Sequence, residues 1–223
     1  MKKNTTPAVP IEETTTFNAE NFHVLCEYLA SRDKDLKTIV TTHGYPPMWT
    51  RENTFETFVH IILEQQVSLA SALAALNKLK EKIKEITPER ILKLTDEEMR
   101  ECYVSRQKNI YIRGLATAIV NGDLDLEKLP EMSNDEVRGI LVGLKGIGNW
   151  TVDVYLMFTL QRTDIFPVGD LAAVNALKRL KQLSPAVTKE DILQIGEQWK
   201  PFRSIASMML WHYYLSVAAK KNH

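Results

Sequence analysis

The sequence predicts an all-α protein of two packed helical lobes around a central helix-hairpin-helix motif. Apolar residues recur at helical spacing along most of the 223-residue chain, and Phe22, Leu25 and Leu29, for example, fall on one helical face. Residues that favour the first or last position of a helix flank most of these segments. The single β-like stretch, TDIFPVGD, is short and is interrupted by Pro167. A chain of this length suits one sizeable domain or two small ones.

The boundaries of the predicted helices follow from residues that suit a helix end. Paired prolines after Tyr45 predict a loop, because proline cannot continue a helix. We predict helices over 18–33, 33–44, 54–66, 69–83, 88–94, 96–102, 106–122, 134–144, 149–160, 171–183, 188–200 and 203–221. The boundary signals are Gly44 and Gly122 at C-termini, Ser68 at an N-terminus, Thr87 before Pro88, and the capping-box pairs Thr95–Glu98 and Ser133–Glu136.

Composition and charge limit the class of protein. The chain is 44% hydrophobic and 25% charged, as soluble globular proteins are. Its 28 basic and 28 acidic residues give a net charge of zero, so bulk charge does not indicate nucleic acid unless basic residues gather on one face. Lys108, Lys178 and Arg203 are expected to be ordinary solvated charges. Cys26 and Cys102 lack a CxxC spacing, which argues against zinc and iron–sulfur sites and favours two buried thiols in a reducing compartment.

The N-terminal segment is expected to be a flexible arm. The residues MKKNTTPAVPIEETTT lack the apolar stretch of a signal peptide, and no apolar run of the chain reaches the length of a membrane span. We therefore predict an intracellular protein with an arm over 1–17 and a folded domain over 18–223. The helix-hairpin-helix is expected at about 133–160.

A glycine-rich stretch, GLKGIGNW, joins two of the predicted helices. Gly143, Gly146 and Gly148 permit backbone conformations and close backbone approaches that other residues do not. Successive N–H groups at the start of the following helix, together with the helix dipole, form an anion site that suits a phosphate. The alternative interpretation is a tight corner between two helices with no ligand.

The longer pattern is more specific. Residues 144–151 read L-x-G-I-G-x-W-T, and Asp170 follows twenty positions after Trp150 in the setting VGD. This combination resembles the helix-hairpin-helix (HhH-GPD) DNA glycosylase superfamily, in which many members have GPD at that place. The stretches ILEQQVSLASA and EQWKPFRSIASMMLW are similar to two motifs of its 3-methyladenine DNA glycosylase II branch. The resemblance covers most of residues 50–215, and this chain is expected to be a minimal helical form without an extra N-terminal β-domain.

The resemblance implies roles for three residues. Asp170 would be the catalytic carboxylate, stabilising positive charge on the deoxyribose and orienting a water molecule. Trp150 occupies the position where strand-cleaving members have a nucleophilic lysine, so the chain would hydrolyse the bond without lyase activity. Trp150 and Trp211 would line the base pocket, where an electron-rich ring attracts a cationic alkylated purine. The alternatives are that Asp170 is a helix cap and that both tryptophans pack in the core.

The resemblance also implies residues that hold DNA. Gln66 aligns with the wedge that fills the gap left by an extruded nucleotide, although it would also suit the end of a helix. Backbone N–H groups of Gly146, Ile147 and Gly148 would contact phosphate. Backbone carbonyls of Val142, Leu144 and Ile147 would hold a structural monovalent cation, and the reaction itself would need no cofactor. Lys145 stands where relatives often have proline, which predicts a looser turn.

Taken together, these features predict a monofunctional DNA glycosylase of base excision repair. Its substrate would be double-stranded DNA containing alkylated purines such as 3-methyladenine and 7-methylguanine. It would act as a cytoplasmic monomer, associated with the nucleoid when bound to DNA, and without a membrane partner. Two alternatives stay open: a non-catalytic helix-hairpin-helix module that binds DNA, and a glycosylase of the same superfamily for mismatched or oxidised bases.

Overall fold

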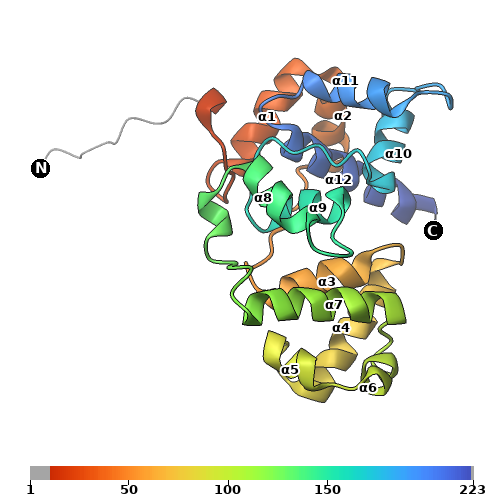
Figure 1. Ribbon diagram of the computed structural model, residues 1–223. Coiled ribbons are helices and arrows are strands. Elements are labelled where there is room, and N and C mark those ends of the chain that lie inside the picture. The colour runs from red at the N-terminus through yellow and green to blue at the C-terminus, as the bar shows by residue number, and fades with distance from the viewer. Residues whose placement is uncertain (1–10, 222–223) are drawn as a thin grey trace, which may run out of the picture. The chain divides into compact units, whose positions relative to one another are not determined.

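The computed structural model describes residues 11–221 and is all-helical over that range (Figure 1). Within it, the β-structure is a single bridge between Thr16 and Arg162. The helices are η1 (Ile11–Glu13), α1 (Phe22–Arg32), α2 (Lys34–His43), α3 (Phe55–Glu64), α4 (Leu69–Ile83), α5 (Pro88–Lys93), α6 (Asp96–Glu101), α7 (Arg106–Val120), η2 (Leu129–Glu131), α8 (Asn134–Val142), α9 (Asn149–Phe158), α10 (Leu171–Leu180), α11 (Lys189–Glu197) and α12 (Arg203–Lys221). The predicted fold class is therefore confirmed.

The chain forms two compact units. Unit 1 combines the residues up to Thr50 with those from Gln161 onward, so it contains α1, α2 and α10–α12. Unit 2 is the continuous segment Arg51–Leu160 and contains α3–α9. The predicted helix-hairpin-helix corresponds to α8 and α9, both in unit 2.

The predicted helix boundaries are confirmed where local chemistry sets them. Ser68 and Thr87 accept the hydrogen bonds of N-terminal caps. Both predicted capping boxes are formed, and Gly44 and Gly122 have φ of +80° just after their helices. Each of these interactions spans only a few residues, which is why the sequence predicts them reliably.

The core of unit 2 is built around α3. The apolar face of this helix, including Phe58, Val59 and Ile62, is fully buried. α3 packs against α4, α7 and α9, and Figure 1 shows α3 and α7 lying side by side. The ring of Phe58 stacks on that of Tyr155 in α9, with centroids 4.4 Å apart. α3 therefore supports the helix that begins after the hairpin.

Unit 1 has its core around the first half of α12. Every residue from Ser204 to Leu210 is buried, and the helix packs against α1, α2 and α10. Cys26 lies in this core, where burial raises the pKa of its thiol to about 12. Cys26 and Cys102 are both free and buried, as predicted. None of the helices in the part of the chain that the structure describes is long and apolar enough to cross a membrane.

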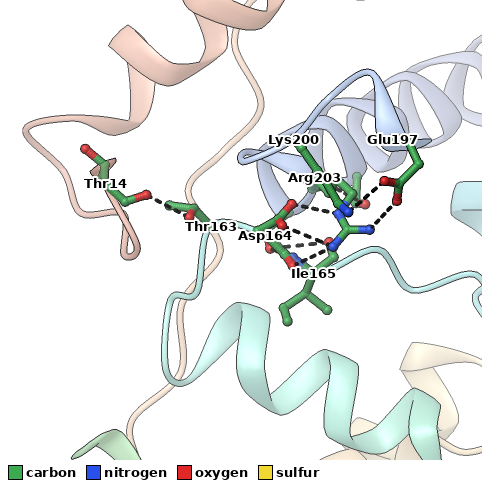
Figure 2. Close-up of polar contacts among 9 residues, drawn as sticks. Thr14, Thr163, Asp164, Ile165, Glu197, Lys200 and Arg203 are labelled. Atoms are coloured by element: carbon green, nitrogen blue, oxygen red, sulfur yellow. Dashed lines mark hydrogen bonds and ion pairs between the residues drawn. The ribbon is translucent and has the colours of Figure 1, made fainter. Parts of the chain in front are cut away.

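The predicted flexible arm over 1–17 extends too far, because residues 14–17 are held by unit 1. Thr163 donates its N–H to the Thr15 carbonyl and its hydroxyl to the Thr14 carbonyl, both at 2.9 Å, and Figure 2 shows the Thr14 contact. Phe17 is 1% exposed. The sequence signal for this boundary is Phe17, a large apolar residue that follows the polar stretch 12–16. Residues 1–10 lie outside the described range.

Asp33 is expected to contribute to stability in a pH-dependent way. It caps α2 and accepts hydrogen bonds from Lys181 Nζ at 3.0 Å and Trp199 Nε1 at 2.9 Å. Burial would raise the pKa of this carboxyl, but the hydrogen bonds from Trp199 and Lys181 outweigh it and hold the pKa below the ordinary 3.8. Its contribution is therefore present above about pH 4 and is lost as the pH falls through the lowered pKa.

Replacement of Asp33 by Asn tests this contribution. We expect Asp33→Asn to lower the free energy of unfolding by about 1–3 kcal/mol at pH 7, because hydrogen bonds to a charged acceptor are lost. The deficit should shrink as the pH is lowered below about 4. Urea unfolding of parent and variant at several pH values measures it. A deficit that stays constant at acid pH would contradict the role of the charge.

Candidate active site

The hairpin between α8 and α9 depends on one glycine. Gly146 has φ of +89°, in the left-handed region that favours glycine. A Cβ atom at this position would lie 2.0 Å from Cγ of Tyr111, a side chain of α7. The backbone of the hairpin therefore packs directly on an aromatic ring, which only glycine allows.

Polar side chains fix the hairpin from both sides. Arg138 of α8 donates to Asp153 Oδ1 at 2.6 Å and to Asn149 Oδ1 at 3.0 Å, so it joins the two helices. Gln65, just after α3, donates from Nε2 to the Gly146 carbonyl at 2.9 Å and to Thr151 Oγ1 at 3.0 Å. Gln65 lies at the end of α3, as predicted, and the structure also makes it part of the hairpin site, a contact that the sequence did not predict.

The first turn of α9 has the features of an anion site. Gly148 is the N-cap residue and has no side chain to accept from the first N–H groups of the helix. Lys145, Gly148 and Asn149 are exposed beside it. The Ile147 N–H was predicted to contact phosphate, but it donates to the Leu144 carbonyl at 3.1 Å within the turn, and the side chain is only 3% exposed. The helix dipole and the amine of Lys145 favour a phosphate here.

The predicted wedge has an unusual backbone. Gln66 is exposed and has φ of +58°, which costs a non-glycine residue about 1–2 kcal/mol. Lys84, Tyr103, Gln161 and Gln182 also have positive φ, so this conformation does not by itself mark Gln66 as a functional residue. Val67 and Leu69, which follow it, are 45% and 67% exposed. The turn and the start of α4 therefore present the polar Gln66 and Ser68 and the apolar Val67 and Leu69 to solvent.

Lys108 supports the same turn from within unit 2. Its Nζ donates to the Leu63 carbonyl at 2.7 Å, near the end of α3. Burial lowers the pKa of this amine below its usual value. Lys108 is therefore not the ordinary solvated charge that the sequence predicts.

Asp170 is the N-cap residue of α10, and its carboxylate is held by two N–H donors. Oδ1 accepts from the Ala173 backbone at 2.9 Å and from Trp211 Nε1 of α12 at 2.8 Å. Asp170 and Trp211 are both half-buried. The cap that the sequence left as an alternative is present. The indole contact, which joins residues 41 positions apart, was not predicted.

The predicted residues divide between the two units. Asp170 and Trp211 meet in unit 1, whereas Gln66, Trp150, Gly146, Ile147 and Gly148 belong to unit 2. Trp150 is half-buried in the first turn of α9. A depression elsewhere in unit 2, between α6 and α7, is lined by charged and polar residues such as Asp96, Arg100 and Asn109, and no predicted site residue lines it.

Comparisons with known proteins agree with this geometry. The family described as "HhH-GPD superfamily base excision DNA repair protein" matches residues 59–202. "DNA-3-methyladenine glycosylase 1" of Schizosaccharomyces pombe is 32% identical over 82% of this chain and 84% of its own length. The Bacillus subtilis protein YfjP is 30% identical to this chain. The match covers 79% of this chain but only 64% of the length of YfjP.

A solved structure gives the same result. Schizosaccharomyces pombe 3-methyladenine DNA glycosylase Mag1, in complex with abasic DNA, superposes with a TM-score of 0.77 at 30% identity. The match covers 84% of this chain and 95% of the Mag1 chain. The chain therefore belongs to the HhH-GPD superfamily of base excision DNA repair proteins, in its 3-methyladenine DNA glycosylase branch.

Proposed function

We propose that the chain is a monofunctional DNA glycosylase that excises alkylated purines from double-stranded DNA and leaves an abasic site. The observation that carries the proposal is the carboxylate of Asp170, fixed at the N-terminus of α10 by Ala173 and Trp211. The names of the relatives support the reaction class, and the abasic DNA bound to Mag1 supports DNA as the substrate.

The chemistry follows from charge. Cleavage of the N-glycosidic bond leaves positive charge on the deoxyribose, and a fixed anion stabilises it. Asp170 supplies that anion and orients or deprotonates a water molecule. N-alkylation makes a purine cationic and a good leaving group, so the site can rely on Asp170 and on the aromatic faces of Trp150 and Trp211. A tryptophan at position 150 has no amine to attack the sugar, so no covalent intermediate forms through it.

A direct assay tests the function. The chain, as a monomer without added cofactor, is incubated with duplex treated with a methylating agent, and free bases are separated chromatographically. Release of 3-methyladenine and 7-methylguanine supports the proposal. Duplex binding without release would favour the non-catalytic module. Release of an oxidised or mismatched base instead would favour the third interpretation, and a borohydride-trapped covalent adduct would contradict the monofunctional mechanism.

The hairpin carbonyls suit a cation. Val142 ends α8, where carbonyls lack helical partners, and Leu144 and Ile147 follow it in the turn. Carbonyl oxygens are ligands that hard cations prefer. We propose that Val142, Leu144 and Ile147 hold a monovalent cation that strengthens phosphate binding without entering the chemistry. Weaker duplex binding in tetramethylammonium than in potassium, at equal ionic strength, would support this.

Gln66 is proposed to fill the gap that an extruded nucleotide leaves. Gln66→Ala is expected to reduce excision from duplex DNA about tenfold, because unstacking a base costs a few kcal/mol that the wedge offsets. Excision from single-stranded DNA, which has no stack to open, should change little. Excision rates on the two substrates measure the difference.

Gln182→Ala is the matched control for this change. Gln182 is an exposed glutamine in unit 1 with φ of +50°, so its replacement has a similar backbone cost. We expect the control to leave both rates unchanged. Equal loss on duplex and single-stranded DNA in Gln66→Ala would argue against a wedge.

A further inference from the structure

The segment that leads to Asp170, residues 163–170, is here called the strap. Its first residues are bound to the start of α12. Ser204 donates its N–H to the Thr163 carbonyl and accepts from the Ile165 N–H at Oγ, both at 2.9 Å. Ser204 is 0% exposed, so this contact lies in the core of unit 1. The strap therefore begins at a fixed point on α12.

Arg203 adds an outer attachment next to Ser204 (Figure 2). Its Nε and Nη2 donate to the two carboxylate oxygens of Asp164 at 2.7 and 3.1 Å, and Nη1 donates to Glu197 Oε1 at 3.0 Å. Arg203 was predicted to be a solvated charge, but its guanidinium joins Asp164 of the strap to Glu197 of α11. A planar guanidinium with two bonds to one carboxylate fixes direction as well as distance.

The middle of the strap packs against the C-terminal end of α11. The Phe166 ring meets the Trp199 ring edge-on, with centroids 5.7 Å apart. A Cβ atom on Gly196 would lie 2.9 Å from this phenylalanine, so the ring packs on bare backbone. Asp170 N–H then donates to the Pro167 carbonyl at 2.8 Å, which closes a turn just before the carboxylate.

The far end of the strap returns to the same helix. Trp211, which holds Asp170 Oδ1 at 2.8 Å, lies seven residues after Ser204 on α12. Seven residues are two turns, about 10 Å along a helix, and place both residues on one face. The intervening residues are all buried, so α12 forms a rigid element that binds the strap at both ends.

We infer that Arg203 is a positioning residue for Asp170, acting through Asp164 and the strap. The inference rests on the proposed function for its catalytic consequence. The side chains of Arg203 and Asp164 are only 20% and 29% exposed, and the guanidinium bonds to both carboxylate oxygens, so the pair restrains the strap at residue 164. Its effect is on geometry: without the guanidinium, the outer edge of the strap is released and the carboxylate loses its fixed direction.

The test compares Arg203→Ala and Arg203→Lys with Lys200→Ala. Lys200 pairs with Glu197 in the same cluster at 2.6 Å, and Glu197 belongs to α11 rather than to the strap. Single-turnover excision, duplex affinity and amide hydrogen exchange are measured for each. Misplacement of a reacting group by about 1 Å can cost about 100-fold. We expect Arg203→Ala to slow excision about 10- to 100-fold with duplex affinity unchanged. Arg203→Lys should be intermediate, and Lys200→Ala should match the parent.

Hydrogen exchange gives a readout that does not need activity. The Ala173 amide bonds to Asp170 Oδ1 and the Ile165 amide to Ser204 Oγ, so both report on the strap. Both should exchange faster in Arg203→Ala and not in Lys200→Ala. Unchanged exchange at both amides overturns the inference, as does an Arg203→Ala excision rate equal to the parent's. If the parent releases no base, the proposed function fails, and exchange alone decides the role of Arg203.

Discussion

Asp170→Asn is expected to slow base excision by at least about 100-fold, while the protein stays folded and binds duplex DNA. Such a loss corresponds to about 2.7 kcal/mol of transition-state stabilisation. Asparagine keeps an Oδ1 acceptor for the Ala173 and Trp211 N–H groups and is as good an N-cap as aspartate. The substitution therefore removes charge and leaves the geometry. Single-turnover rates on methylated duplex measure the effect.

Asp33→Asn is the matched control, because Asp33 is also an N-cap aspartate in unit 1. It should lower stability at neutral pH with little change in the excision rate of the folded protein, the reverse of Asp170→Asn. An Asp170→Asn protein that cleaves as fast as the parent would remove the carboxylate from the mechanism. A large fall in its unfolding free energy would show that the aspartate serves the fold.

Gly146→Ala is expected to have the largest effect on stability. The new Cβ atom would meet the Tyr111 ring at 2.0 Å, and φ of +89° is unfavourable for alanine. The left-handed conformation costs about 1–2 kcal/mol and overpacking about 1–3 kcal/mol. We therefore expect a loss of about 2–5 kcal/mol in the free energy of unfolding, measured by urea titration.

Gly148→Ala separates this packing effect from a general sensitivity of the hairpin. Gly148 has no atom within 4 Å of a built Cβ, and its φ of −97° is accessible to alanine. Its replacement should cost about 1 kcal/mol or less, from the weaker N-cap. Equal losses in the two variants would show that Tyr111 yields and that the close approach at Gly146 is dispensable.

The sequence predicts features that depend on neighbouring residues. The capping boxes at Thr95 and Ser133 and the turn glycines are decided within a few residues, and the structure has them as predicted. The family motif around Trp150 likewise predicted the hairpin between α8 and α9. The N-cap role of Asp170 could be proposed from the sequence for the same reason, because it depends only on the position of Asp170 just before a helix.

Contacts between distant residues were not predictable in this way. Gln65 and Gly146 are 81 positions apart, and Arg203 and Asp164 are 39 apart. Helical periodicity says which face of a helix is buried but not which side chain of another helix it meets. Arg203 and Lys108 were therefore expected to be solvated, although both bond within their own units. The roles of Asp170, Trp150 and Gln66 in catalysis stay predictions.

The amide of Gln65 mechanically links the proposed phosphate site to the proposed wedge. Its two hydrogen bonds attach the turn after α3 to the first turn of α9, and Gln66 is the next residue in that turn. For the proposed phosphate site and the proposed wedge, this link means that a displacement of the hairpin is passed on to Gln66. The two proposed DNA contacts would then keep a nearly fixed separation as the protein moves along a duplex.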